Sequence, residues 1–247
     1  MRRITLFLAF SLICLFVSAQ NADEIIEKYF ENTGGKDAWN SITSLRLNAS
    51  VNTPVGEIPL VIYNAKNGST YVKITLQGND ITQIAFDGET AWGMNMMSMQ
   101  AEKQNSENTE NLKRASKEFP DPFLNYKEKG FAIELLGNEI IEGTECFKIK
   151  LTKTPNLVDG VETENILYYY FDKENVVPIL VEAEIKSGPA KGNISQTFFS
   201  NYQEVNGIYF SFSFTQGLKG QQGQTITIKT IEINPEIDKS TLAFPES

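Results

Sequence analysis

The sequence has 247 residues, a formal net charge of −9, two cysteines and no histidine. The acidic balance disfavours nucleic acid and anionic membrane surfaces as partners, because both attract basic patches. The lack of histidine excludes Ser-His-Asp and Cys-His catalysis and imidazole ligation, and no cysteine pair or acidic spacing indicates zinc or calcium, so we expect no enzyme activity, no metal and no cofactor.

Residues 1–19 have the pattern of a cleaved secretory signal peptide. Arg2 and Arg3 give the positive start, residues 4–17 are almost wholly apolar, and Val17-Ser18-Ala19 offers the small residues of a cleavage site. The apolar run is too short to span a bilayer core of about 30 Å, and no later segment approaches membrane length. We therefore expect an exported chain, with residues 20–247 forming a single domain and no transmembrane span.

The mature chain is expected to open with two helices. Asp23 can cap the first, whose apolar residues recur at helical spacing from Ile25 to Phe30 until Gly34-Gly35 ends it. Lys36 to Ile42 form a short second helix that carries Trp39. A third, polar helix is expected over 107–118, with apolar Leu112, Ala115 and Phe119, before Pro120-Asp121-Pro122.

Strand patterns occupy most of the remaining chain. Apolar and polar residues alternate, for example over 208–215, which is typical of antiparallel sheet with one apolar and one wetted face. Turn dipeptides such as Asp159-Gly160 and Asn206-Gly207 separate the runs. Ile226 and Ile228 are out of phase with Ile231 and Ile233, which predicts a bulge near Lys229-Thr230. We expect about eleven strands, over 44–53, 57–65, 69–77, 80–87, 90–96, 130–141, 144–152, 162–172, 176–187, 192–204 and 207–216, with a further one at 223–234.

Four smaller features carry expectations of their own. The methionines at 94, 96, 97 and 99 form either a soft cavity wall or mouth, or filler in the core. In the run 168–171, two rings should face each side of the sheet. Glu182 and Glu184 should be solvated charges on the convex face. Cys146 has no partner within the mature chain, and we expect it to be buried and inert.

The size of the sheet predicts a hollow. Eleven strands about 4.8 Å apart make a sheet roughly 50 Å wide, and sheets that wide curl, split or close. Its apolar face measures on the order of 1,000 Å² or more, whereas each short helix covers only about 100–200 Å². Either the sheet folds onto itself, or it curls around a space that loops and a ligand fill.

Three segments resemble the periplasmic lipoprotein carriers of the outer-membrane lipoprotein-sorting family (LolA- and LolB-like). Ala85-Phe86-Asp87-Gly88-Glu89-Thr90-Ala91-Trp92 resembles that family's S-D-G-K-T-L-W hairpin. The start, residues 22–29 through 33–36, looks like the opening of related sorting proteins. The end, Ile237-Asp238 with Phe244-Pro245, is similar to their D-x-x-x-F-x-F-P segment.

The resemblance implies a mainly β (α+β) fold: a curved antiparallel half-barrel of about eleven strands, with two or three helices closing a concave face that takes up acyl chains. It also implies a basic residue after the second strand that holds a closed lid. Lys66 is the nearest candidate, in Ala65-Lys66-Asn67, where the family more often has K-R-P and where Lys lacks the bidentate geometry of Arg.

The function expected from these features is a periplasmic carrier, a lipid- or lipoprotein-binding chaperone of outer-membrane biogenesis. It would bury acyl chains reversibly and meet transport components of the inner and outer membranes. The alternative is an envelope sensor or scaffold of the same fold that binds a protein partner and carries no lipid. The expected ligand-binding residues are Leu60, Ile62, Lys66, Val72, Ile74, Ile84, Phe86, Trp92, Met94, Met96, Met97, Phe210 and Phe212.

Overall fold

The computed structural model describes residues 21–54 and 56–245, so the expected signal peptide lies outside the described residues. Its helices are α1 (Ala22–Asn32), α2 (Lys36–Asn40) and α3 (Ser106–Ser116), with a 3₁₀ turn at Lys239–Thr241. Its strands are β1 (Ser44–Thr53), β2 (Gly56–Ala65), β3 (Thr70–Leu76), β4 (Asn79–Phe86), β5 (Ala91–Met94), β6 (Ala101–Lys103), β7 (Ala132–Ile141), β8 (Thr144–Val158), β9 (Val161–Asp172), β10 (Pro178–Glu184), β11 (Ile194–Val205), β12 (Ile208–Leu218) and β13 (Gln224–Ile233).

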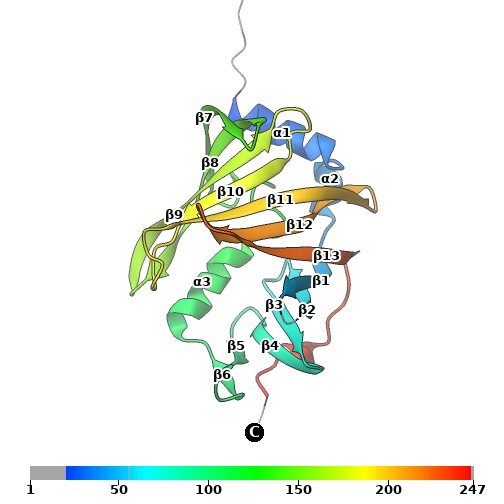
Figure 1. Ribbon diagram of the computed structural model, residues 1–247, viewed down its shortest axis with the longest axis vertical. Coiled ribbons are helices and arrows are strands. Elements are labelled where there is room, and N and C mark those ends of the chain that lie inside the picture. Colours follow the sequence, from blue (N-terminus) through cyan, green and yellow to red (C-terminus); the bar gives the residue numbers. More distant parts are fainter. Residues whose placement is uncertain (1–20, 55, 246–247) are drawn as a thin grey trace, which may run out of the picture.

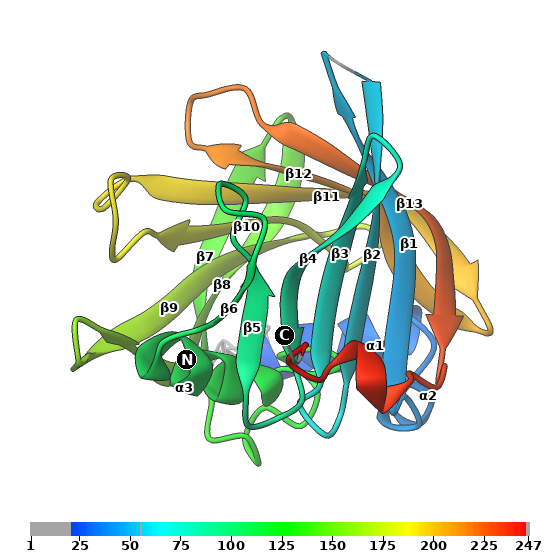
Figure 2. The ribbon, with the colours of Figure 1, turned by 90° about the horizontal axis from the view of Figure 1, so that it is seen from below.

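One antiparallel, strongly curved sheet contains all of these strands (Figures 1 and 2). Its order is β6-β5-β4-β3-β2-β1-β13-β12-β11-β10-β9-β8-β7, so β6 and β7 are the two edges and the sheet does not close. The chain passes from one edge to the other through α3 and residues 117–131. The sheet is therefore a half-barrel whose open side is crossed by α3.

The expected mainly β, curved antiparallel fold is confirmed, but the number of strands was wrong. The sheet has 13 strands rather than about eleven, because β13 is a full member and β6 was missed. The predicted bulge is present: Asn48 pairs with Thr230 and Ala49 with Ile228, which leaves Lys229 as the extra residue of β13. It keeps Ile228 and Ile231 on one face.

The cap of α1 differs from the prediction. Asn21, not Asp23, is the N-cap, and it forms a capping box in which its side chain accepts from the Glu24 N–H. Asp23 instead bonds the Tyr126 hydroxyl and pairs with Lys127 at 2.8 Å. These contacts, led by the Lys127 hydrogen bond, lower the pKa of Asp23. Among the described residues, no helix has the length and apolarity needed to cross a membrane.

The main core fills only part of the curved sheet. α1 contributes Ile25, Ile26 and Phe30, and α2 contributes Trp39. They share one cluster with inward-facing residues of β1, β2, β8, β9, β12 and β13 and with Phe123, Leu124, Tyr126 and Phe131. α1 and α2 therefore pack over part of the inner face only, and the expectation that helices close the whole concave face is not confirmed.

A second, smaller cluster lies on the outer face. Tyr170 packs there with Cys146 and Leu180, while Tyr169 and Phe171 belong to the main core, so two rings of the run 168–171 face each way as expected. Cys146 is buried, also as expected, and burial raises the pKa of its thiol. Glu182 was expected to be solvated, but only 8% of it is exposed. Its carboxylate accepts from Tyr170 and Gln196 and pairs with Lys219 at 2.8 Å.

Candidate functional site: an uncovered apolar row on the inner face

Strand register aligns four apolar residues across β1–β4. Leu47 pairs with Ile62, Ile62 with Val72, and Val72 with Ile84. Directly paired residues of neighbouring strands share a face, so these side chains form one row, which we call the open row. All four are only half-buried. By contrast Ile149, Leu151 and Phe171, on the inner face of β8 and β9, have no exposed surface.

Further rows flank the open row on the same face. Ala49, Leu60, Ile74 and Ile81 form the next row toward one end of the strands, and Ile58 and Leu76 follow beyond Leu60 and Ile74. Asn64, Thr70 and Phe86 form the row on the other side. Residues two apart in a strand are about 6.8 Å apart, so the four rows from Asn64 to Ile58 define an apolar trough about 20 Å long.

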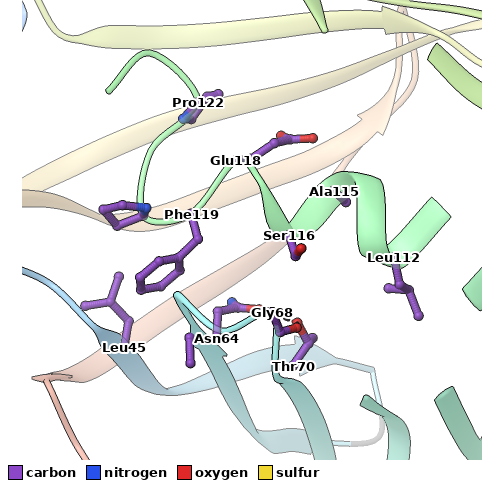
Figure 3. A pocket seen from close by; sticks show the side chains of 12 residues that line it. Leu45, Asn64, Gly68, Thr70, Leu112, Ala115, Ser116, Glu118, Phe119 and Pro122 are labelled. Atoms are coloured by element: carbon purple, nitrogen blue, oxygen red, sulfur yellow. Dashed lines mark hydrogen bonds between the residues drawn. The ribbon is translucent and has the colours of Figure 1, made fainter. Parts of the chain in front are cut away.

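Three cavities lie beside this trough, and two of them are bounded by α3. One, of about 390 Å³, is bounded by Leu45, Asn64 and Thr70 from the sheet, by Leu112 and Ala115 from α3, and by Phe119 and Pro120 (Figure 3). A second, of about 490 Å³, lies between Ile84, the same two α3 residues, Lys153 and Asn165. A third, of about 430 Å³, lies at the far end, against Ile58, Leu76 and Ile81. Each has the size of a small-molecule site.

α3 is tied to only one side of the opening. Within the described residues, every side-chain hydrogen bond from α3 to a strand or turn of the sheet goes to the β8–β9 hairpin. Asn111 donates to the Leu157 carbonyl and accepts from the Leu157 N–H, both at 2.8 Å. Arg114 donates to the Pro155 carbonyl at 2.6 Å and pairs with Glu162 at 3.1 Å. No residue of α3 is buried, so the helix is held by polar contacts rather than by a core.

The segment after α3 is anchored to α1. Asp121 accepts from the Tyr29 hydroxyl at 2.9 Å and from the Phe123 N–H at 2.8 Å. The Lys129 ammonium donates to the Asp121 carbonyl at 2.6 Å. Burial raises the pKa of the Asp121 carboxyl and lowers that of Lys129. Closer to α3, Lys153 pairs with Glu118 at 2.6 Å beside the second cavity.

Six of the thirteen expected ligand-binding residues lie together on the inner face of β2–β4: Leu60, Ile62, Val72, Ile74, Ile84 and Phe86. Phe210 and Phe212 also face inward. Phe212 belongs to the main core, as Leu60 does, and Phe210 packs against that core, as Ile62 and Ile74 do. The Phe210 ring lies 5.1 Å from that of Trp39. Leu112, Ala115 and Phe119 were not among the expected residues, although the helical spacing of the insert had already marked them as its apolar positions.

The structure does not bring Trp92 and Met94 to the inner face. Phe86 pairs with Ala91 and Ala85 with Trp92, so Trp92 lies on the outer face with Ala85, and Met94 follows it. The Trp92 indole donates to the Leu242 carbonyl at 2.8 Å and packs against Phe244. Trp92 therefore anchors the C-terminal segment.

The other methionines and Lys66 also lie away from the open row. Met96, Met97 and Met99 occupy the turn between β5 and β6, where Met97 is 97% exposed, so they are not core filler. Only Met96 and Met99 border a cavity, the third one. Lys66 lies in the exposed turn after β2, and its ammonium forms no ion pair with any described residue. Nor do the described residues contain a cluster of acidic or cysteine side chains able to hold a metal.

No protein-family model and no curated protein matches the chain. Solved structures do share its fold. A LolA superfamily protein from Nitrosomonas europaea superposes with a TM-score of 0.55 at 14% identity, covering 91% of this chain and 98% of that one. A domain assigned to the outer membrane lipoprotein-sorting proteins, from Vibrio parahaemolyticus, gives 0.51 at 10% identity, covering 89% and 94%. A DUF1329 family protein from Desulfovibrio piger gives 0.55 at 12% identity, covering 91% and 98%. The expected resemblance is confirmed at the level of the fold.

Proposed function

We propose that this chain, which has the fold of the LolA superfamily, is a periplasmic carrier that binds acyl chains of lipids or lipoproteins and moves them toward the outer membrane. The binding surface is the open row with the partly exposed members of its flanking rows, beneath α3, while Ala49, Leu60, Ile81 and Phe86 are buried around it. Residues 1–19 would be removed on export and residues 20–247 would act as one binding domain without catalysis. Transport components of the inner and outer membranes would deliver and accept the cargo.

The partial exposure of the open row is the observation that carries the proposal. Four aliphatic side chains in register at the centre of an inner face would ordinarily be buried, as Ile149 and Leu151 are on the opposite half of the same sheet. Each buried methylene is worth about 0.8 kcal/mol, so ten or so methylenes laid along the trough would give roughly 8 kcal/mol before ordering costs.

The polar residues of the second cavity suggest how a ligand would be oriented. Asn111, Asn165 and the Lys153–Glu118 pair line the second cavity, which borders the open row at Ile84 of β4. These groups suit an ester or amide head, which needs hydrogen bonds when it leaves water. The aliphatic rows suit the tail. The proposal therefore places the head beside Asn165 and the tail along Ile84, Val72 and Ile62.

Two measurements test the proposal. Organic extraction of the purified protein followed by lipid mass spectrometry should recover an acyl-containing molecule. Fluorescent fatty-acid binding should then fall by roughly tenfold or more in Ile62→Glu and in Ile84→Glu, because an unpaired charge in an apolar site is costly. Ile140→Glu is the matched control, since Ile140 is 71% exposed on β7.

The opposite results would support the rival function. A protein that extracts without lipid and takes up no fatty acid would be a sensor or scaffold that binds a protein partner. Thermal melting of each variant separates loss of the site from loss of the fold: the proposal expects Ile62→Glu to lose binding while it still unfolds cooperatively. Equal binding by wild type, Ile62→Glu and Ile84→Glu would refute the assignment of the open row.

A further inference from the structure

The turn between β5 and β6 presents methionines to solvent at one end of the molecule's long axis (Figure 1). Met97 is 97% exposed, and Met96 and Met99 are about half exposed, at 48% and 50%. No charged residue occurs from Thr90 to Ala101, although 21% of the chain is charged. Together these residues, which we call the methionine turn (95–100), form an uncharged apolar tip on an acidic protein.

The backbone of the methionine turn is hydrogen-bonded within the turn itself. The Asn95 side chain accepts from the Met97 and Ser98 N–H groups, at 2.9 and 3.2 Å. The Asn95 N–H donates to the Gln100 carbonyl, and the Met99 N–H donates to the Asn95 carbonyl, both at 2.8 Å. A segment that enters hydrocarbon must satisfy its polar backbone internally, because no water is available there. The turn meets that requirement for these four donors.

Met99 adopts a backbone conformation that does not favour methionine. Its φ is 54°, in the left-handed region that glycine or asparagine occupies at lower cost. A methionine in this region is strained, and its half-exposed side chain offsets little of that strain by packing.

Two acidic groups in this part of the molecule form ion pairs, and a third, Glu102, keeps its charge. Asp80 pairs with Lys73 at 2.6 Å, and Glu57 pairs with Lys229. Glu102 accepts from the Asn95 amide at 2.9 Å. Anionic repulsion at this end of the molecule is therefore reduced, although the chain as a whole carries −9. An uncharged partner surface therefore suits this end of the molecule better than an anionic or a cationic surface.

From these observations we infer that the methionine turn inserts into the apolar edge of a zwitterionic lipid surface, so that cargo passes between that surface and the trough. The inference extends the proposed carrier function and rests on it. Met96 and Met99 border the cavity that contains Ile58, Leu76 and Ile81, so the tip is continuous with the far end of the trough. Methionine is also enriched at protein interfaces, so the lipid surface is inferred from the lack of charge and from the continuity with the trough.

Fluorophore labelling tests the insertion directly. Met97→Cys can be labelled with an environment-sensitive dye, because the native Cys146 is buried. On addition of phosphatidylcholine vesicles, the emission of this label should shift to the blue, while the same label on Ile140→Cys should not respond. In vesicle flotation, Met97→Glu should bind about tenfold more weakly than wild type, because it places a charge in hydrocarbon.

Fatty-acid uptake from solution separates this inference from the carrier proposal. Met97→Glu should take up free fatty acid as wild type does, because Met97 lines none of the cavities beside the trough. Wild type that binds fatty acid but neither floats with vesicles nor shows the blue shift would overturn the inference and leave the carrier. Vesicle association that depends on Met97, in a protein that takes up no fatty acid, would support insertion and refute the carrier.

Discussion

Replacing Asn111 by alanine should free α3 from the β8–β9 hairpin without unfolding the protein. Asn111 makes two hydrogen bonds to the main chain of Leu157, each 2.8 Å long. A hydrogen bond contributes about 1 kcal/mol net, so the variant loses about 2 kcal/mol of the energy that docks the helix. Because 1.4 kcal/mol corresponds to a factor of ten, the equilibrium between docked and undocked α3 should move about 30-fold toward the undocked state.

The absence of buried residues in α3 makes this effect local. The core formed by α1, α2 and the sheet is untouched, so the midpoint of global unfolding should change little. Hydrogen exchange read by mass spectrometry should show faster exchange over 106–116 and ordinary protection in β8, β9 and β12. A fatty acid bound in the trough should leave the variant faster than wild type, up to about 30-fold if undocking limits its release.

A matched control lies on the same helix. The Asn108 side chain donates only to the Gln104 side chain, which lies just before α3. Asn108→Ala therefore makes the same change of residue type without removing a contact to the hairpin. Exchange over 106–116 should respond to Asn111→Ala far more than to Asn108→Ala. Equal acceleration in both variants would show that intrinsic helix propensity, rather than attachment to β8, sets the stability of α3, and the reasoning would fail.

Three further predictions concern stability. Glu182→Ala should destabilise the fold by about 2–3 kcal/mol in urea unfolding, because the Tyr170 hydroxyl and the Gln196 amide lose their buried acceptor. The control is Glu184→Ala at an exposed position of the same strand, which should cost under about 0.5 kcal/mol. Burial raises the pKa of Asp121 above its ordinary value of 3.8, so the folded state binds this proton more tightly than the unfolded state and loses stability as pH rises through the raised pKa. Asp121→Asn should lack that loss, so its stability relative to wild type should increase as pH rises above 3.8; a difference that is constant with pH would contradict this. Cys146 should react with a thiol reagent only after unfolding, and neither reductant nor chelator should shift Tm; a clear fall in Tm with chelator would reveal a metal site.

The sequence predicted those features that depend on local patterns. Alternation located each strand of more than three residues, and the change of phase after Ile228 predicted the bulge at Lys229, because both are properties of one strand and its neighbour. β6 has only three residues, Ala101–Lys103, and shows no apolar alternation, so nothing in its sequence distinguishes it from a loop. Its pairing with β5 supplies the signal, and that is a tertiary contact.

The alternation within strands correctly placed the expected residues of β2–β4 on one face, whereas the face expected for Trp92, across the next turn, was wrong. Leu60 to Phe86 follow from alternation within strands, whereas the face of Trp92 depends on how the turn at 87–90 sets the register of β5. Asp87 accepts from the Glu89 and Thr90 N–H groups, and the resulting turn pairs Phe86 with Ala91. A shift of one residue would have placed Trp92 inside. Likewise, how much of the sheet α1 and α2 cover depends on tertiary packing, which the alternation within strands does not reveal.

The pairing of β1 with β13 has a consequence for the order of folding. Arg46 of β1 contacts Glu232 of β13, 186 residues later, and this pairing joins the two halves of the sheet. The remaining neighbours are consecutive strands that can zip together as hairpins soon after they are synthesised. A chain made from its N-terminus therefore holds two incomplete ribbons until its last strand emerges, and the trough acquires its shape only when the final ladder joins them. Truncation within β13 should for this reason abolish the trough as a whole rather than shorten it.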